Sequence, residues 1–357
     1  MSSAFVHTLY DEHAFAHCAY TTKVVRWVEM MGDIGEEITV YWGGDEPVDT
    51  AGVADYVSLM SNDEQAHYFG DDLPAAILQL DWNPETAHWR ALNHRTAAAL
   101  YSRLNQGDVI CVLSGSNHNG LIHEFSYAKF LEPWVGYGGI SQQTYAKVYE
   151  SSAWRHLLAG QYAIADGNPL DTVIPNFYRP NDFELGTDDG YLLFIGRMIL
   201  RKGIEDAVTI ARRCGRPLLI VGQGATVEGD TIRCNDNTVL EPKGADITYL
   251  GVVGPERRRE LYAHASATLV PTLYWEPFGG VFAEAMMSGV VPVCRDWGSF
   301  VEYVPDQFRF STVDQALEAL EAAVAHRGEA IRHAAIEQFS TDVCAKRYAE
   351  WLGRVRQ

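Results

Sequence analysis

The sequence lacks the features that mark several classes of protein. No apolar run reaches the roughly 18–20 residues that a membrane-spanning helix needs. The first residues, MSSAFVHTLYDEHAF, have neither the basic nor the apolar stretch of a signal peptide. No C-x-x-C pair or cluster with zinc-ligand spacing occurs among the six cysteines, which are Cys18, Cys111, Cys214, Cys234, Cys294 and Cys344. These absences predict a soluble cytoplasmic protein with free thiols and no structural metal.

Positive charge is scarce, and it is unevenly distributed. The formal net charge is -19, and residues 1–175 hold only 8 Lys+Arg against 22 Asp+Glu. The rest of the chain holds 20 Lys+Arg against 25 Asp+Glu. This balance argues against a protein whose main partner is nucleic acid or an anionic membrane. The relative excess of cations in the second half favours that half as the site of an anionic ligand.

The length of 357 residues and the 47% hydrophobic content are sufficient for two cores. Apolar runs and helical periodicity alternate along the chain. Strands are predicted near 4–9, 38–42, 108–113, 130–135, 191–195, 217–221, 247–250, 267–270 and 290–294, and helices near 19–31, 94–105, 204–213, 282–288, 313–325 and 344–354. The polar, turn-rich residues 181–190 predict a linker. We therefore expect an α/β fold of two doubly wound parallel-sheet domains, with the carboxyl ends of both sheets facing a cleft.

Two cations stand at a predicted strand-to-helix turn in the second half. Arg197 follows Gly196 at the end of a strand, and Lys202 lies just before the next helix. Backbone N–H groups at a helix start favour anions, and an arginine fork beside a lysine suits a diphosphate. A solvated basic turn has the same local sequence, so this segment alone leaves both interpretations open.

Two carboxylates, Glu276 and Glu284, stand eight residues apart in the segment EPFGGVFAE. If the helix begins near Gly280, Glu276 lies before its N-terminus and Glu284 in its second turn. Glycines at this point would let a ligand approach the backbone. Two carboxylates could accept hydrogen bonds from two sets of sugar hydroxyls, although a helix cap and a surface Glu would have the same pattern.

Taken together, these segments resemble the large family of retaining GT-B glycosyltransferases that carry an E-x7-E motif. The N-terminal half resembles phage-type glycosyltransferases. The pieces occur in the family's order: V-I-P-N at 173–176, G-R-x4-K-G at 196–203, V-G-x-G at 221–224, the E-x7-E segment at 276–284, and G-x3-E at 298–302. The resemblance covers most of residues 170–305. It implies two Rossmann-like domains, with an acceptor-side domain at 1–173 and a donor-binding domain at 174–340. The helix at 341–357 would cross back to the first domain.

The resemblance also implies a role for each matching residue. Arg197 and Lys202 would bind the donor diphosphate, Glu276 would face the donor sugar, and Glu284 would hold the ribose. Further donor contacts would come from Gly196, Gly222, Phe278, Gly279 and Gly280. The donor would be a nucleotide-diphosphate sugar of UDP or GDP type. No cofactor or metal is implied, since the cations would replace it, and the sequence offers no D-x-D pair.

The N-terminal half carries weaker signals for the acceptor side. The family's sugar-contacting histidine is missing after the strand near 130–135, where Glu132 and Tyr137 are candidate substitutes. His13, His17 and His118 follow other predicted strands. Each of these histidines could equally have a plain structural role.

Several functions remain open on the sequence alone. The chain could transfer a sugar to a hydroxymethylated DNA base, although the acidic first half disfavours a duplex held through its phosphates. It could instead be a GT-B epimerase or hydrolase of nucleotide sugars, or a non-catalytic binding module. A small sugar, a lipid carrier and a protein side chain are further acceptors that the sequence leaves open.

Overall fold

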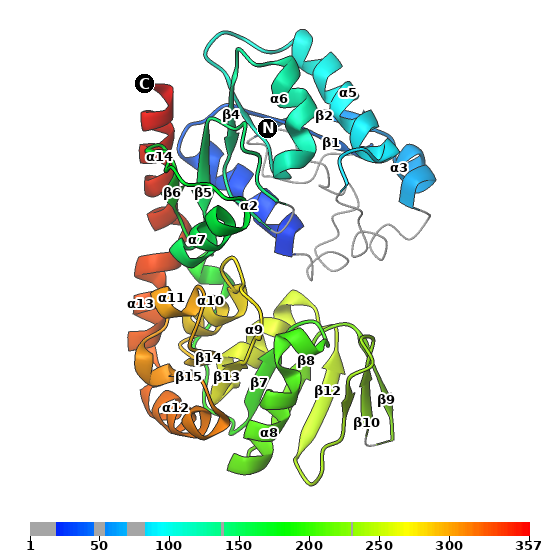
Figure 1. Ribbon diagram of the computed structural model, residues 1–357. Coiled ribbons are helices and arrows are strands. Elements are labelled where there is room, and N and C mark those ends of the chain that lie inside the picture. The colour runs from blue at the N-terminus through cyan, green and yellow to red at the C-terminus, as the bar shows by residue number, and fades with distance from the viewer. Residues whose placement is uncertain (1–18, 46–53, 70–82, 137–138, 230) are drawn as a thin grey trace. The chain divides into compact units, whose positions relative to one another are not determined.

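A computed structural model describes residues 19–45, 54–69, 83–136, 139–229 and 231–357 (Figure 1). The chain divides into two compact units. Unit 1 consists of Met1–Glu150, Arg155–Ile174 and Ala345–Gln357, and unit 2 consists of Ser151–Trp154 and Pro175–Cys344. In the described part of the chain, no helix has the length and apolar character needed to cross a bilayer.

Unit 1 contains two parallel sheets. One has the order β3-β4-β5-β6, with β3 at Val109–Cys111, β4 at Lys129–Glu132, β5 at Ala146–Tyr149 and β6 at Thr172–Val173. The other pairs β1 (Ile38–Gly43) with β2 (Ala54–Met60). The helices that belong wholly or mainly to unit 1 are α2 (Ala19–Asp33), α3 (Asn62–Phe69), α5 (Ala87–Tyr101), α6 (Asn119–Glu124), α7 (Ser152–Gln161) and α14 (Thr341–Arg356). Trp89, Leu92, Phe125 and Phe130 are central to its core.

The C-terminal part of α14 is bonded to unit 1. Trp351 Nε1 donates to the Leu170 carbonyl at 2.8 Å, and the Tyr348 hydroxyl donates to the Pro133 carbonyl at 2.7 Å. Both aromatic side chains are almost fully buried. Burial of large aromatic rings with their polar atoms bonded holds this helix in the unit although it lies at the far end of the sequence.

Unit 2 is built on a six-stranded parallel sheet with the order β12-β8-β7-β13-β14-β15. The strands are β7 (Leu192–Ile195), β8 (Leu218–Val221), β12 (Ile247–Gly251), β13 (Ala267–Val270), β14 (Pro292–Arg295) and β15 (Arg309–Phe310). In chain order this is 3-2-1-4-5-6, the doubly wound arrangement. Leu192 and Phe194 belong to one buried cluster and Leu193 to another, so β7 is covered on both faces.

Helices and a small sheet complete unit 2. The helices are α8 (Ile204–Cys214), α9 (Pro255–His264), α10 (Gly280–Met287), α11 (Phe300–Tyr303), α12 (Val313–His326) and α13 (Glu329–Phe339). Thr312 and Gln315 form a capping box at the start of α12, which satisfies N–H groups that the helix leaves unbonded. A three-stranded antiparallel sheet contains β9 (Ala225–Glu228), β10 (Thr231–Cys234) and β11 (Val239–Leu240).

The structure corrects two expectations about local structure. The helix predicted near 94–105 occupies Ala87–Tyr101 instead, because Trp89 and Leu92 extend its buried face toward the N-terminus. The polar residues 181–190 are not a linker but part of unit 2. Asp188 accepts a hydrogen bond from Ser266 Oγ at 2.6 Å, and the Asp189 N–H donates to the His264 carbonyl. Polar side chains here bond to neighbouring elements of the unit.

Candidate functional site

The three segments that contain the predicted donor-binding residues meet at the carboxyl ends of the unit 2 strands. Gly196–Gly203 follows β7, Gly222–Gly224 follows β8, and the residues up to Gly280 follow β13. The strand order reverses between β7 and β13, which is where doubly wound sheets bind ligands. A Cβ on Gly222 would stand 1.7 Å from the Gly196 carbonyl oxygen, so glycine is required for the two turns to touch.

The backbone amides of these two glycines already have partners. The Gly196 N–H donates to the Val221 carbonyl at 3.0 Å, and the Gly222 N–H donates to the Gly251 carbonyl at 2.8 Å. Gly196 and Gly222 therefore shape the site through close packing, and their N–H groups are committed to neighbouring strands. The stem of Lys202 lies 3.7 Å from where a Cβ on Gly196 would stand.

Lys202 and Glu276 form an ion pair across the switch point. Lys202 Nζ lies 2.7 Å from Glu276 Oε1, which also accepts a hydrogen bond from Thr272 Oγ1 at 3.0 Å. Burial lowers the pKa of the Lys202 ammonium, but the Glu276 carboxylate and Tyr274 together outweigh burial, so the net pKa is raised. Lys202 therefore stays charged at the carboxyl end of the sheet.

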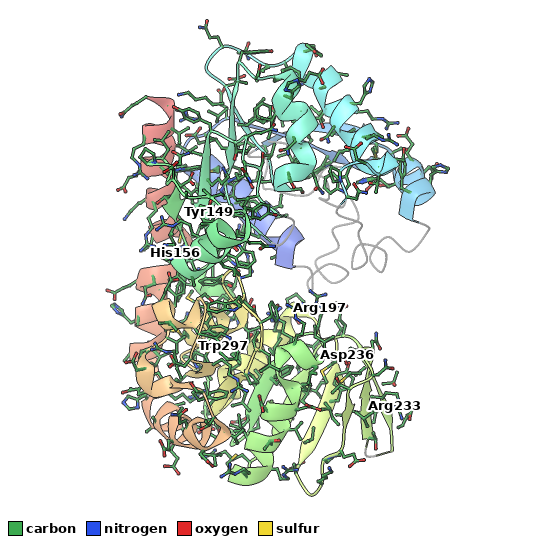
Figure 2. The ribbon with its side chains drawn as sticks, in the orientation of Figure 1. Tyr149, His156, Arg197, Arg233, Asp236 and Trp297 are labelled. Atoms are coloured by element: carbon green, nitrogen blue, oxygen red, sulfur yellow. The ribbon has the colours of Figure 1, made fainter. Side chains whose placement is uncertain are left out.

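Arg197 is exposed, and Figure 2 shows its side chain projecting from the ribbon of unit 2. Its guanidinium forms no ion pair or hydrogen bond with any residue that the structure describes. The planar fork of Arg197 is thus available to an incoming anion.

The two carboxylates of the E-x7-E segment are arranged alike around a pair of glycines. Glu276 binds the protein through Oε1, and its Oε2 lies 3.4 Å from where a Cβ on Gly279 would stand. Glu284 binds through Oε2, and its Oε1 lies 3.9 Å from where a Cβ on Gly280 would stand. Among the described residues, none donates a hydrogen bond to these second oxygens. Each carboxylate therefore keeps one oxygen for a ligand beside the glycine pair.

The glycine pair lies at the start of α10, which begins two residues before the helix predicted near 282–288. Gly279 has a φ of +88° and precedes the helix, which begins at Gly280. The first N–H groups of a helix have no acceptor within it and carry partial positive charge. The backbone here suits an anion or a hydroxyl oxygen.

Two residues that sequence reasoning missed hold Glu284 in place. Arg258 on α9 forms an ion pair with Glu284 Oε2, and the Tyr262 hydroxyl donates to the same oxygen at 2.9 Å. The segment PERRRELYAH contains three consecutive arginines, and nothing in the local sequence distinguishes Arg258 from its neighbours. Only the fold brings α9 against α10.

Phe278 has its side chain in the core of unit 2, which leaves its backbone for the predicted donor path. Its ring is 1% exposed and packs against Phe282, Tyr303 and Phe339 in the core of unit 2. Phe278 can contribute to a ligand site only through its backbone. The ring anchors the segment between Glu276 and α10, and this anchoring fixes where the glycines stand.

In unit 1, His118 lies in a buried position. It ends a 3-10 turn (Gly115–His118) after β3 and is 0% exposed. Its Nδ1 bonds Asn93 Oδ1 at 2.8 Å, since Asn93 Nδ2 is taken by the Asn117 carbonyl. Burial lowers the pKa of His118 to about 4, so the ring is neutral near pH 7.

Glu132 ends β4 and is likewise enclosed, at 1% exposure. Its Oε1 accepts hydrogen bonds from the Ser141 N–H at 3.0 Å and from Thr144 Oγ1 at 2.8 Å. Burial raises the pKa of Glu132 to about 7, although the Lys147 charge and these hydrogen bonds oppose the shift. Its partners tie down the loop that follows β4.

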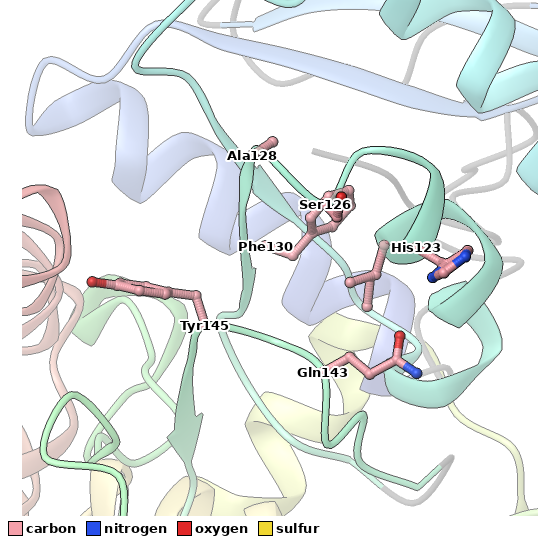
Figure 3. A pocket seen from close by; sticks show the side chains of 7 residues that line it. His123, Ser126, Ala128, Phe130, Gln143 and Tyr145 are labelled. Carbon is pink, nitrogen blue, oxygen red and sulfur yellow. The ribbon is translucent and has the colours of Figure 1, made fainter.

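The remaining acceptor-side candidates, His13, His17 and Tyr137, lie outside the described residues. A surface pocket of about 270 Å³ in unit 1 involves none of the predicted residues. Figure 3 shows its lining, which includes His123, Phe130, Gln143 and Tyr145. Ala128 and Tyr145 precede β4 and β5, so the pocket lies toward the amino ends of these strands.

Comparison with known proteins gives a family match and a set of related sequences. Residues 179–327 match the family described as "Glycosyl transferases group 1". The chain is 31% identical over 121 residues to an uncharacterized glycosyltransferase of Methanocaldococcus jannaschii, and this match covers 33% of this chain and 30% of that protein. The matches span only 30–40% of the length of the curated relatives.

Solved structures resemble the chain over nearly its whole length. Sucrose-phosphate synthase from Thermosynechococcus elongatus has a TM-score of 0.70 at 15% identity, covering 99% of this chain and 98% of that one. Anabaena HepE in complex with UDP and glucose has a TM-score of 0.62 at 14% identity, covering 93% of this chain and 95% of that one. These likenesses establish the GT-B fold. The match to the glycosyl transferases group 1 family lies within unit 2, at residues 179–327.

Proposed function

We propose that the chain is a glycosyltransferase that moves a sugar from a nucleotide-diphosphate sugar to a hydroxyl group of an acceptor. One observation carries this proposal: Glu276 Oε2 and Glu284 Oε1 remain unbonded by described residues on either side of Gly279 and Gly280. Carboxylate oxygens at two points along a helix start can bind hydroxyls of two different rings. The resemblance to HepE, which was solved with UDP and glucose, supports a nucleotide sugar as the donor.

The cations suit the diphosphate that joins the two rings. Lys202 keeps its charge beside Glu276, and Arg197 is unbonded by described residues at the end of β7. In the proposed complex Arg197 and Lys202 bind the diphosphate, Glu284 binds the ribose and Glu276 faces the sugar. Negative charge that develops on the leaving diphosphate would be stabilised by both cations. These two charges provide the role for which other enzymes use a metal ion, and we therefore propose a metal-independent reaction.

We further propose that the sugar keeps its anomeric configuration. The acceptor hydroxyl oxygen forms a bond to the anomeric carbon on the face from which the diphosphate leaves. The bond from that carbon to the phosphate oxygen breaks with its electron pair, and this oxygen takes the proton of the acceptor. No protein base is then needed. Glu276 Oε2 would position the sugar and stabilise positive charge at the anomeric carbon.

Turnover of nucleotide sugars with and without acceptors tests the proposal. UDP-glucose and GDP-glucose are the first probes, and release of nucleoside diphosphate is measured against a panel of hydroxyl acceptors. A transferase releases nucleoside diphosphate in proportion to glycosylated product. Release without acceptor would indicate a hydrolase, interconversion of the sugar an epimerase, and binding without turnover a binding module. Proton NMR of the first product formed would reveal an inverted anomeric coupling if retention is wrong.

A further inference from the structure

Glu284 is held by two donors on a single oxygen. The Arg258 guanidinium and the Tyr262 hydroxyl both approach Glu284 Oε2, the latter at 2.9 Å. The side chains of Arg258 and Glu284 are 30% and 16% exposed, so the pair is partly shielded from water. A carboxylate bonded through one oxygen loses its freedom to rotate, and the other oxygen then points in one direction.

The two donors, Arg258 and Tyr262, are themselves held by contacts within unit 2. Tyr262 is 1% exposed and belongs to the cluster that contains Leu193 of β7 and Ala285 of α10. Burial raises the pKa of Tyr262 well above its usual value, and the Glu284 carboxylate adds to this, so the phenol remains a donor. The Arg258 guanidinium lies 5.9 Å from the centre of the Tyr262 ring, one helical turn earlier on α9.

The oxygen that remains, Oε1, is turned toward Gly280. A Cβ there would stand 3.9 Å from Oε1 and 2.7 Å from the Tyr178 hydroxyl, so glycine keeps this space open. An acceptor oxygen fixed in orientation discriminates between a ligand with a hydroxyl at that point and one without. If both donors were absent, the carboxylate could turn and either oxygen could meet the ligand.

We propose that Arg258 and Tyr262 are positioning residues that present Glu284 Oε1 to the ligand and thereby make the site selective for a nucleotide whose ribose carries its hydroxyl groups. This inference rests on the proposed function, in which Glu284 binds the ribose. It adds a determinant of nucleotide selection that lies on α9, outside the E-x7-E segment.

The test is the ratio of dissociation constants for 2′,3′-dideoxy and ordinary nucleoside diphosphates, measured by calorimetry with UDP and GDP and their dideoxy forms. For the unaltered protein we expect a ratio of about 10- to 150-fold, the size of a hydrogen bond to a charged group. In Arg258→Met and Tyr262→Phe the ratio should fall toward 1, mainly because the ribonucleotide binds more weakly. Arg258→Lys keeps the positive charge, so its ratio should lie between that of Arg258→Met and that of the unaltered protein.

General damage to the fold would weaken both ligands alike and leave the ratio unchanged, so an unchanged ratio in both variants overturns the inference. Tyr262→Phe removes one oxygen only, and it serves if the arginine variant does not fold. Arg257→Met is the matched control, because Arg257 lies on the same helix and pairs with Glu260 instead. An unaltered protein that binds nucleotides without discrimination would overturn the inference and the assignment of the ribose to Glu284, but not sugar transfer itself. One that binds no nucleotide would overturn the proposed function as well.

Discussion

Glu276 and Glu284 in unit 2 and Glu132 in unit 1 each bind the protein through one oxygen and keep the other beside a glycine, but Glu132 and His118 are almost wholly enclosed, at 1% and 0% exposure. All four follow the ends of strands or lie close to them, so position along the sheet does not separate them. Their surroundings do. The carboxylates of unit 2 are paired with cations. At Glu132, the rise in pKa that burial causes is opposed only in part by neutral hydrogen-bond donors and by the charge of Lys147.

This contrast separates two uses of a polar side chain. A carboxylate that is paired with a cation through one oxygen can accept hydrogen bonds from a ligand through the other. An enclosed carboxyl with a raised pKa responds to pH, because burial disfavours its charged form. The comparison therefore predicts that changes in unit 2 alter ligand binding and turnover, and that changes at Glu132 alter stability.

The largest effect should come from removing both cations of unit 2. In Arg197→Ala/Lys202→Ala, the affinity for UDP or GDP should fall by roughly 3–6 kcal/mol, because each charged hydrogen bond contributes about 1.5–3 kcal/mol. Calorimetry measures the loss. Arg212→Ala, an exposed cation on α8, is the control and should bind normally. Equal affinities for the double variant and the unaltered protein would contradict the assignment.

Next in size is the loss of charge at Glu276. Glu276→Gln keeps the shape of the side chain but weakens stabilisation of the positive anomeric carbon, so turnover should fall by about 10²–10³. The affinity for nucleoside diphosphate should change by less than about twofold, since Glu276 faces the sugar in the proposed complex. The exposed Glu321→Gln is the matched control. Normal turnover in the Glu276 variant would remove the proposed role.

In unit 1, Glu132 should control how stability depends on pH. Its pKa is raised from 4.5 to about 7 in the folded protein, so folding favours its protonated form. The contribution of Glu132 to the free energy of unfolding is complete below pH 4.5 and is lost as pH rises toward 7. The loss is on the order of 3 kcal/mol. His118 acts in the opposite sense, because its lowered pKa of about 4 removes stability as pH falls below 6.5.

Because these two contributions oppose each other, the difference in unfolding free energy between variant and unaltered protein, plotted against pH, is more informative than the plot for either protein alone. Denaturant unfolding of Glu132→Gln and of the unaltered protein between pH 4.5 and 8 should show the variant gaining relative stability as pH rises. Glu85→Gln, an exposed carboxylate before α5, should show no such trend. Parallel curves for Glu132→Gln and the unaltered protein would mean that Glu132 does not titrate in this range.

The smallest expected effect is that of chelation. If Arg197 and Lys202 supply the positive charge, turnover with EDTA should stay within about twofold of turnover with added Mg²⁺ or Mn²⁺. The assay uses the donor identified by the turnover screen. Complete loss of activity with EDTA that Mg²⁺ restores would show that the two cations are insufficient.

The sequence by itself determined the strands and helices with strong apolar patterns, such as β13 at 267–270 and α12 near 313–325. It also placed the start of α10 to within two residues, because two glycines precede an apolar helical pattern. The helix α9 was missed, since only Leu261, Tyr262 and Ala263 of its ten residues are buried and its pattern is weak. The antiparallel sheet of β9, β10 and β11 was missed as well, because its short strands carry few buried side chains.

Only the tertiary structure decided what each polar group touches. Lys202 and Glu276 are separated by 74 residues in the chain, and Arg258 and Glu284 by 26, so no local pattern indicates either pair. Burial of His118 likewise depends on α5, which brings Asn93 and Trp89 against it. Local sequence determines backbone conformation through short-range sterics and periodicity, whereas ion pairs and burial depend on contacts between segments that only folding brings together.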